Sequence, residues 1–181
     1  MFKFLGLALV LVSWIAGIYL VKKWQGERSM PLSRHAARTD DASRLFTSVL
    51  IIGGFGFYIW LVRWFAPALG LSTVFIVLVT LAFAGQVITA LVPAKDVWKR
   101  KIHKLASFGM GWLYFPISYC ILSARRLSSA ALIIGLVCAA YMVTAAVLFF
   151  TVKRARKHYL IFQALYFVAF QVIILSAAYL R

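Results

Sequence analysis

Apolar residues run along this chain in six long blocks, which short polar connections separate. The blocks cover residues 2–21, 45–65, 71–92, 105–124, 130–152 and 159–180. Each block is about as long as the roughly 20 helical residues that cross a hydrocarbon core ~30 Å thick. The pattern therefore predicts six transmembrane helices within a single domain, residues 1–181.

The apolar blocks are continuous and do not alternate with polar positions. Residues 131–134, for example, read Ala-Leu-Ile-Ile, whereas a membrane β-barrel strand is apolar at every second position. Hydrophobic residues make up 64% of the chain, well above the roughly 45–50% of soluble domains. These features predict an all-α fold, a polytopic transmembrane six-helix bundle.

Basic residues are concentrated in alternate connections. Of the 20 Lys and Arg residues, fifteen lie in the connections 22–44, 93–104 and 153–158, which six spans would place on one side of the membrane. Short cytoplasmic loops are enriched in Lys and Arg. We therefore expect a multi-pass protein of the cell membrane, with these basic loops in the cytoplasm and both termini outside.

The net charge of +16 also bears on the expected partners. Nucleic acid is not expected, because the chain has no folded polar domain that could present a basic groove. Membrane lipids are the expected partners, since the cations would face anionic headgroups on the cytoplasmic side. A second copy of the chain, or another membrane protein, remains a possible partner.

The first connection is the only one with room for extra structure. Its stretch Ser33–Arg44 predicts a short helix at the headgroups. Asp40 and Asp41 are expected to cap the second helix, and Asp96 to cap a helix that leads into the fourth block.

Histidine and cysteine positions argue against a bound cofactor. Bis-histidine haem needs imidazoles inside the spans, but His35, His103 and His158 all lie in connections or at helix ends. Cys120 and Cys138 form no CxxC pair. We therefore expect no metal and no cofactor.

Polar residues inside the apolar blocks are the first candidate site. Ser107, Gly111, Tyr114 and Ser118 step by four, three and four residues and so share one helix face. Hydrogen bonds between helices, worth about 0.6 kcal/mol each in membranes, are one role for such groups. The alternative is a pocket between the third, fourth and sixth helices that binds a lipid or small apolar ligand. Its candidate residues are Gln86, Tyr114, Ser118, Gln163 and Gln171.

The connection before the fourth block holds a second candidate site. Arg100 and His103 stand beside the apolar residues Trp98 and Ile102, so this segment is suited to the membrane interface. Each cation near an anionic surface contributes about 1 kcal/mol. Arg100 and His103 are therefore candidates for binding a phosphate-bearing lipid headgroup, with a purely topological role as the alternative.

One segment carries a resemblance to known proteins. Thr89-Ala90-Leu91-Val92-Pro93 ends the third block, and Ile102-His103-Lys104-Leu105-Ala106 opens the fourth. This arrangement resembles a broad group of uncharacterised six-span prokaryotic integral membrane proteins. The resemblance covers the third and fourth blocks and implies a helical bundle, without implying an activity.

Three functions remain open at this stage. The first is a non-enzymatic protein that binds lipid or an apolar molecule, or that serves as an accessory subunit of a membrane complex. The second is a small transporter or channel for a neutral solute. The third is a membrane enzyme that uses Asp96 and His103 at its cytoplasmic face.

Overall fold

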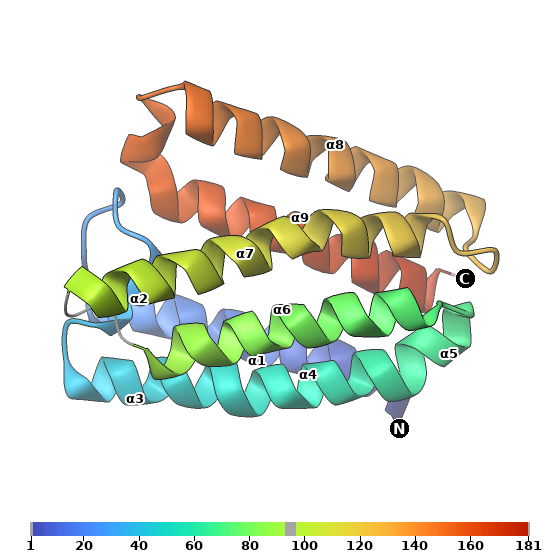
Figure 1. The fold of residues 1–181 in the computed structure, drawn as a ribbon, viewed down its shortest axis with the longest axis horizontal. Helices are drawn as coiled ribbons and strands as arrows, with labels where there is room; N and C mark the ends of the chain where they lie inside the picture. Colours follow the sequence, from blue (N-terminus) through green and yellow to red (C-terminus); the bar gives the residue numbers. More distant parts are fainter. Residues whose placement is uncertain (1, 93–96, 181) are drawn as a thin grey trace.

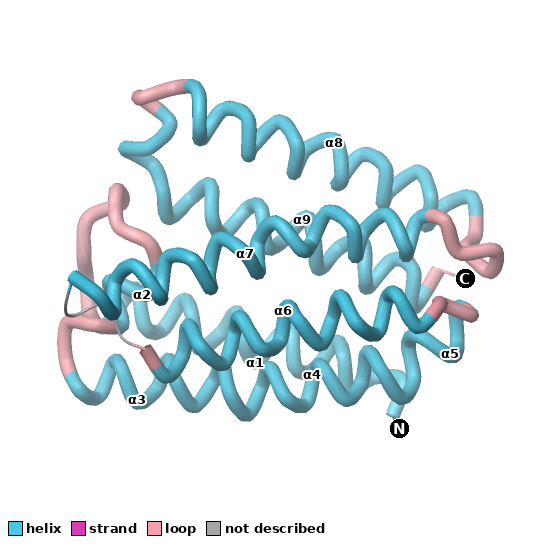
Figure 2. Tube along the Cα trace, in the orientation of Figure 1, coloured by secondary structure: helices cyan, strands magenta, loops and turns pink. Residues whose placement is uncertain are grey.

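The computed structural model describes residues 2–92 and 97–180, and within these ranges the chain forms helices and no strand (Figures 1 and 2). Six helical segments are long and apolar enough to cross a membrane, which confirms the predicted all-α bundle. Four are single helices and one adds a short 3-10 turn before its helix: α1 (Phe2–Lys23), α6 (Thr73–Leu91), α7 (Val97–Leu122), α8 (Ser129–Thr151), and η3 (Ala155–His158) with α9 (Tyr159–Tyr179).

The second spanning segment is a composite helix over Asp40–Leu69. Two π-helical segments interrupt it, so that it reads α3 (Asp40–Ser48), η1 (Val49–Gly53), α4 (Gly54–Trp60), η2 (Leu61–Phe65) and α5 (Ala66–Leu69). It ends at Gly70, whose φ of 68° is left-handed. Glycine adopts this conformation at little cost, so it suits the sharp turn into α6.

Two helices begin earlier than the apolar blocks that predicted them. The second starts at Asp40, five residues before residue 45, because the Thr39 hydroxyl caps it by accepting the Ala42 N–H at 3.1 Å. Asp40 and Asp41 therefore lie in the first turn, where they favour the helix dipole, and Thr39 is the capping residue. The fourth starts at Val97, eight residues before residue 105, while Asp96 lies outside the described residues.

The first connection folds back over one end of the bundle. It contains the short helix α2 (Leu32–Ala36), which covers part of the interfacial helix expected over residues 33–44. The Leu160 N–H donates to the Arg28 carbonyl at 3.1 Å, so this connection is fixed to the start of α9. We call this side, with residues 24–39 and 152–158, the basic end.

Both chain ends lie at the opposite end of the bundle (Figure 1). There the Tyr179 hydroxyl donates to the Lys3 carbonyl at 2.7 Å, and the Phe4 and Tyr179 rings stack. The first and last helices are therefore joined at this end.

The buried core occupies the half of the bundle nearest the chain ends. Its largest fully buried side chains include Trp60, Phe65, Phe75, Ile117 and Ile173. The peripheral helix α8 packs mainly on α9 and more lightly on α7, with only Ala131, Gly135, Met142 and Ala145 buried. The half nearest the basic end is packed less densely, and both cavities described below lie in it.

Candidate functional site

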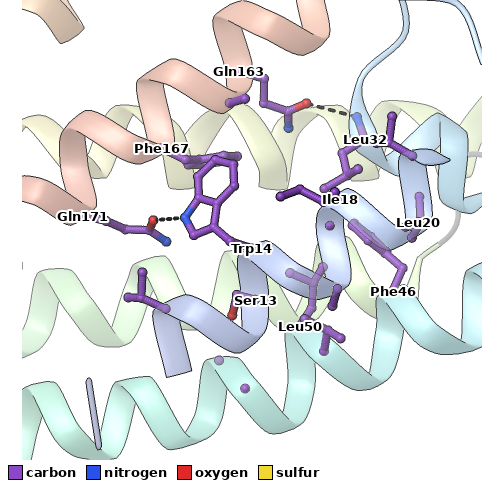
Figure 3. A pocket seen from close by; sticks show the side chains of 18 of the residues that line it. Ser13, Trp14, Ile18, Leu20, Leu32, Phe46, Leu50, Gln163, Phe167 and Gln171 are labelled. Carbon is purple, nitrogen blue, oxygen red and sulfur yellow. Dashed lines mark hydrogen bonds between the residues drawn. The ribbon is translucent and has the colours of Figure 1, made fainter. Parts of the chain in front are cut away.

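One cavity in the described structure lies between α1, the composite second helix and α9. Its volume is about 540 Å³, within the roughly 300–1,000 Å³ typical of small-molecule sites. α6 and α7 contribute Gln86, Met110 and Tyr114 to its wall. We call it the α1–α9 cavity, and Figure 3 shows it from close by.

Two glutamines on α9 face this cavity from one side. The Trp14 indole N–H donates to the side-chain oxygen of Gln171, and the Leu32 backbone N–H donates to the side-chain oxygen of Gln163 at 3.0 Å (Figure 3). Each bond uses only the oxygen of its glutamine. The NH₂ groups of both amides have no hydrogen-bond partner among the described residues, so each leaves two N–H donors for a ligand.

Gln86 and Tyr114 add polar groups on other walls of the cavity. The Gln86 NH₂ donates to the Leu50 carbonyl at 2.7 Å, within the π-helical segment η1, and its own oxygen has no partner in the described part of the chain. The Tyr114 ring stacks on Phe170 with centroids 3.9 Å apart. Its hydroxyl likewise has no hydrogen-bond partner within residues 2–92 and 97–180. The remaining lining is mostly apolar.

A second cavity, of about 420 Å³, lies between α7, α8 and α9, with residues 29–34 over its basic end. We call it the α7–α8 cavity. Aromatic rings line its depth, among them Phe108, Trp112, Phe115 and Phe149. Arg34 and Lys104 line it at the basic end, and both side chains are exposed. Its wall therefore combines an aromatic interior with cations at one end.

Two buried polar atoms on this second wall have no hydrogen-bond partner among the described residues: His103 Nε2 and Thr89 Oγ1. His103 is 5% exposed and Thr89 6%. The other ring nitrogen of His103 donates to the Val92 carbonyl at 2.9 Å and so joins α7 to the end of α6. With its proton on Nδ1, the neutral ring carries an acceptor lone pair on Nε2.

The structure brings together four of the five predicted ligand-binding residues. Gln86, Tyr114, Gln163 and Gln171 line the α1–α9 cavity, whose walls include the first and second helices as well as the expected third, fourth and sixth. Ser118 lines neither cavity and is buried in the core half, 3% exposed.

The predicted headgroup pair is not brought together. His103 is buried in the α7–α8 cavity wall, whereas Arg100 is exposed and lines neither cavity. The cations that accompany His103 are instead Arg34, which is distant in sequence, and Lys104. Sequence reasoning missed these two because it selected Arg100 in the connections and assigned Arg34 and Lys104 to topology. It missed Trp14 because a tryptophan in an apolar helix carries no distinguishing signal.

The described structure contains no group of side chains suited to binding a metal ion. No three His, Cys, Asp or Glu residues there are grouped closely enough to hold an ion, and Cys120 and Cys138 are free thiols.

Comparisons of the chain with family models, curated proteins and solved structures find no match. The resemblance of residues 89–106 to six-span prokaryotic membrane proteins stays a prediction. The function of this chain is therefore inferred from its geometry.

Proposed function

We propose that this chain is a non-enzymatic, multi-pass protein of the cell membrane that binds an apolar molecule in the α1–α9 cavity. The observation that carries the proposal is the cavity itself: about 540 Å³ of largely apolar space, bordered by three amides that each keep one polar atom unbonded among the described residues. Apolar pockets with a few convergent polar groups are typical small-molecule sites. The expected ligand has a hydrocarbon body and one or two hydrogen-bonding groups.

The route into this cavity is lateral, between α1 and α9. The two helices contact each other through Tyr179 and Lys3 at the end of the bundle that holds the chain termini. They also contact each other through Trp14 and Gln171, about halfway along α1. Further toward the basic end, Ile18 and Ile161 line the cavity and are also exposed on the outer surface. A molecule dissolved in the bilayer would enter here without crossing water.

The packing of the bundle favours binding over passage of a solute. The core around Trp60, Phe65 and Phe75 fills the half of the bundle beyond the cavity, so the space ends inside the protein. An enzyme at the cytoplasmic face gains less support, because the buried His103 is bonded to the Val92 carbonyl. A role as accessory subunit of a membrane complex is compatible with ligand binding.

The proposal is tested by filling the cavity at a glycine. A Cβ built on Gly17, which lines the α1–α9 cavity, meets nothing within 4 Å, so the side chain of Gly17→Leu starts in open space at this wall. Gly109 also has open space at its Cβ, and it lines neither cavity. Gly109→Leu is therefore the matched control.

We expect native mass spectrometry of wild-type protein in mild detergent to show a co-purifying apolar molecule at up to one per chain. Gly17→Leu should lower its occupancy at least fivefold, and Gly109→Leu should leave it unchanged. Both substitutions replace a helical glycine, which favours the helix by up to about 1 kcal/mol. A wild-type protein without a bound molecule, or equal occupancy in all three proteins, would contradict the proposal.

A further inference from the structure

The α7–α8 cavity differs from the α1–α9 cavity in charge and in hydrogen bonding. The two share seven lining residues, among them Gln86, Gln163 and Phe167. Lys22 is the one cation in the lining of the α1–α9 cavity, whereas the lining of the α7–α8 cavity has two cations and a buried histidine. Its contents are therefore expected to differ as well.

The basic end of the α7–α8 cavity is suited to a phosphate. Arg34 extends from α2 and Lys104 from α7, and both side chains are exposed where they line the cavity. Neither is part of an ion pair that the described residues form. A guanidinium and an ammonium at one rim can bind the oxygens of a phosphodiester by charge-assisted hydrogen bonds.

The interior of the same cavity is suited to an acyl chain. Below the cations the lining is aromatic, and the rings of Trp112 and Phe150 stack with centroids 6.1 Å apart. Trp112 is 55% exposed and Phe150 47%, so these rings also form part of the outer surface of α7 and α8. One hydrocarbon chain could pass between the two helices while a second chain remained in the bilayer.

Two buried polar atoms in the wall point to a ligand that also carries hydroxyl groups. His103 Nε2 and Thr89 Oγ1 are both desolvated and unpartnered in the described structure. A buried polar atom without a hydrogen bond costs about 1–3 kcal/mol, and this cost is recovered when a ligand supplies the partner. A headgroup hydroxyl can donate to the lone pair on His103 Nε2.

We infer that the α7–α8 cavity is a binding site for one anionic phospholipid of the leaflet next to the basic end. Its phosphate lies between Arg34 and Lys104, one acyl chain enters among the rings of α7 and α8, and a headgroup hydroxyl reaches His103. The site adjoins the α1–α9 cavity through shared wall residues, but Arg34, Lys104 and His103 line only the α7–α8 cavity. The inference therefore does not depend on the function proposed for the α1–α9 cavity.

The test compares lipid binding by purified full-length variants. Phosphatidylglycerol is the probe, because it supplies a phosphate and hydroxyl groups, and phosphatidylcholine is the zwitterionic reference. Native mass spectrometry then measures the apparent affinity for each added lipid. We expect wild-type protein to bind one phosphatidylglycerol at least tenfold more tightly than phosphatidylcholine.

Three variants separate a specific site from general attraction to charge. Arg34→Ala with Lys104→Ala should weaken phosphatidylglycerol binding roughly 10- to 30-fold. Arg100→Ala with Lys101→Ala removes the same charge from exposed positions outside the cavity and should change it less than threefold. Gly111→Leu should abolish the single-lipid complex, because Gly111 lines this cavity and its Cβ position is open.

The outcomes are distinct. Equal losses in the two double variants would overturn the inference and leave only non-specific attraction of anionic lipid to the basic end. Unchanged binding in Gly111→Leu would overturn it too, since the chain would then lie outside the cavity. Because Gly17→Leu fills the other cavity, it should leave phosphatidylglycerol binding intact whether or not the first proposal holds.

Discussion

At Gly6 the first helix approaches the second spanning segment closely. A Cβ at this position would lie 2.5 Å from ring atoms of Trp60, which is fully buried. The flat indole therefore packs directly on the backbone of α1. Close approach at small residues is the usual way in which helices associate in lipid, where no hydrophobic driving force exists between them.

We expect Gly6→Ala to destabilise the protein by about 1–3 kcal/mol, the usual cost of overpacking a well-packed core. The measurement is the unfolding transition in mixed detergent micelles as the SDS fraction rises. Gly17→Ala serves as the control, because the space around that glycine is open, and it should match or slightly exceed wild type. Equal transitions for Gly6→Ala and wild type would show that Trp60 can move aside at little cost.

The sequence identified some of the cavity-lining residues and missed others. Gln86, Gln163 and Gln171 could be selected because an amide in an apolar block has to find a partner or line a cavity. Arg34 and Lys104 could not, because their shared position depends on how residues 24–39 fold over the bundle. Hydropathy along the chain carries no information about that contact.

Helix boundaries depend on capping as much as on hydropathy. The polar turn Thr39–Ser43 belongs to the second helix although it is not apolar, because the Thr39 hydroxyl accepts the Ala42 N–H. The apolar block therefore predicted the membrane-crossing part of this helix and missed its polar first turn. The same holds for α7, whose first two turns contain Lys99, Arg100 and Lys101.

We expect Thr39→Ala to lower stability by about 1 kcal/mol, because it removes the acceptor that caps α3. Thr39→Ser keeps a hydroxyl at the same position and should retain most of wild-type stability. The helix content and the SDS unfolding midpoint measure both effects. If serine and alanine proved equally destabilising, the threonine would act through its methyl group and not through the cap.

The whole molecule is asymmetric along its long axis. Its core lies in the half near the chain ends, whereas both cavities and the described parts of the three basic connections lie toward the other end. Six blocks of apolar sequence predicted the number of spanning helices. They did not predict which helices pack against each other, since every helix is apolar on most of its surface. The hollow half of the bundle follows from tertiary packing and has no counterpart in the hydropathy pattern.

Sidedness is the prediction that belongs to this scale. We expect the basic end to face the cytoplasm, because fifteen of the 20 Lys and Arg residues lie in its connections. In a background with Cys120 and Cys138 replaced by alanine, a membrane-impermeant thiol reagent should label Ser129→Cys in intact cells. Ser29→Cys should react only after permeabilisation. The reverse labelling would place the basic end outside.

The light packing of α8 on α7 bears on the rate at which a bound lipid exchanges, as well as on the amount of lipid bound. This helix forms one wall of the α7–α8 cavity, yet it buries only three alanine-sized or smaller residues and one methionine. Because α8 packs mainly on α9 and more lightly on α7, it has little side-chain packing to lose when it moves away from α7. We expect its excursions to set how quickly a bound lipid exchanges with the bilayer, while Arg34 and Lys104 set how much is bound. A covalent tether between α8 and α7 should accordingly lengthen the residence time of the lipid and leave its occupancy almost unchanged.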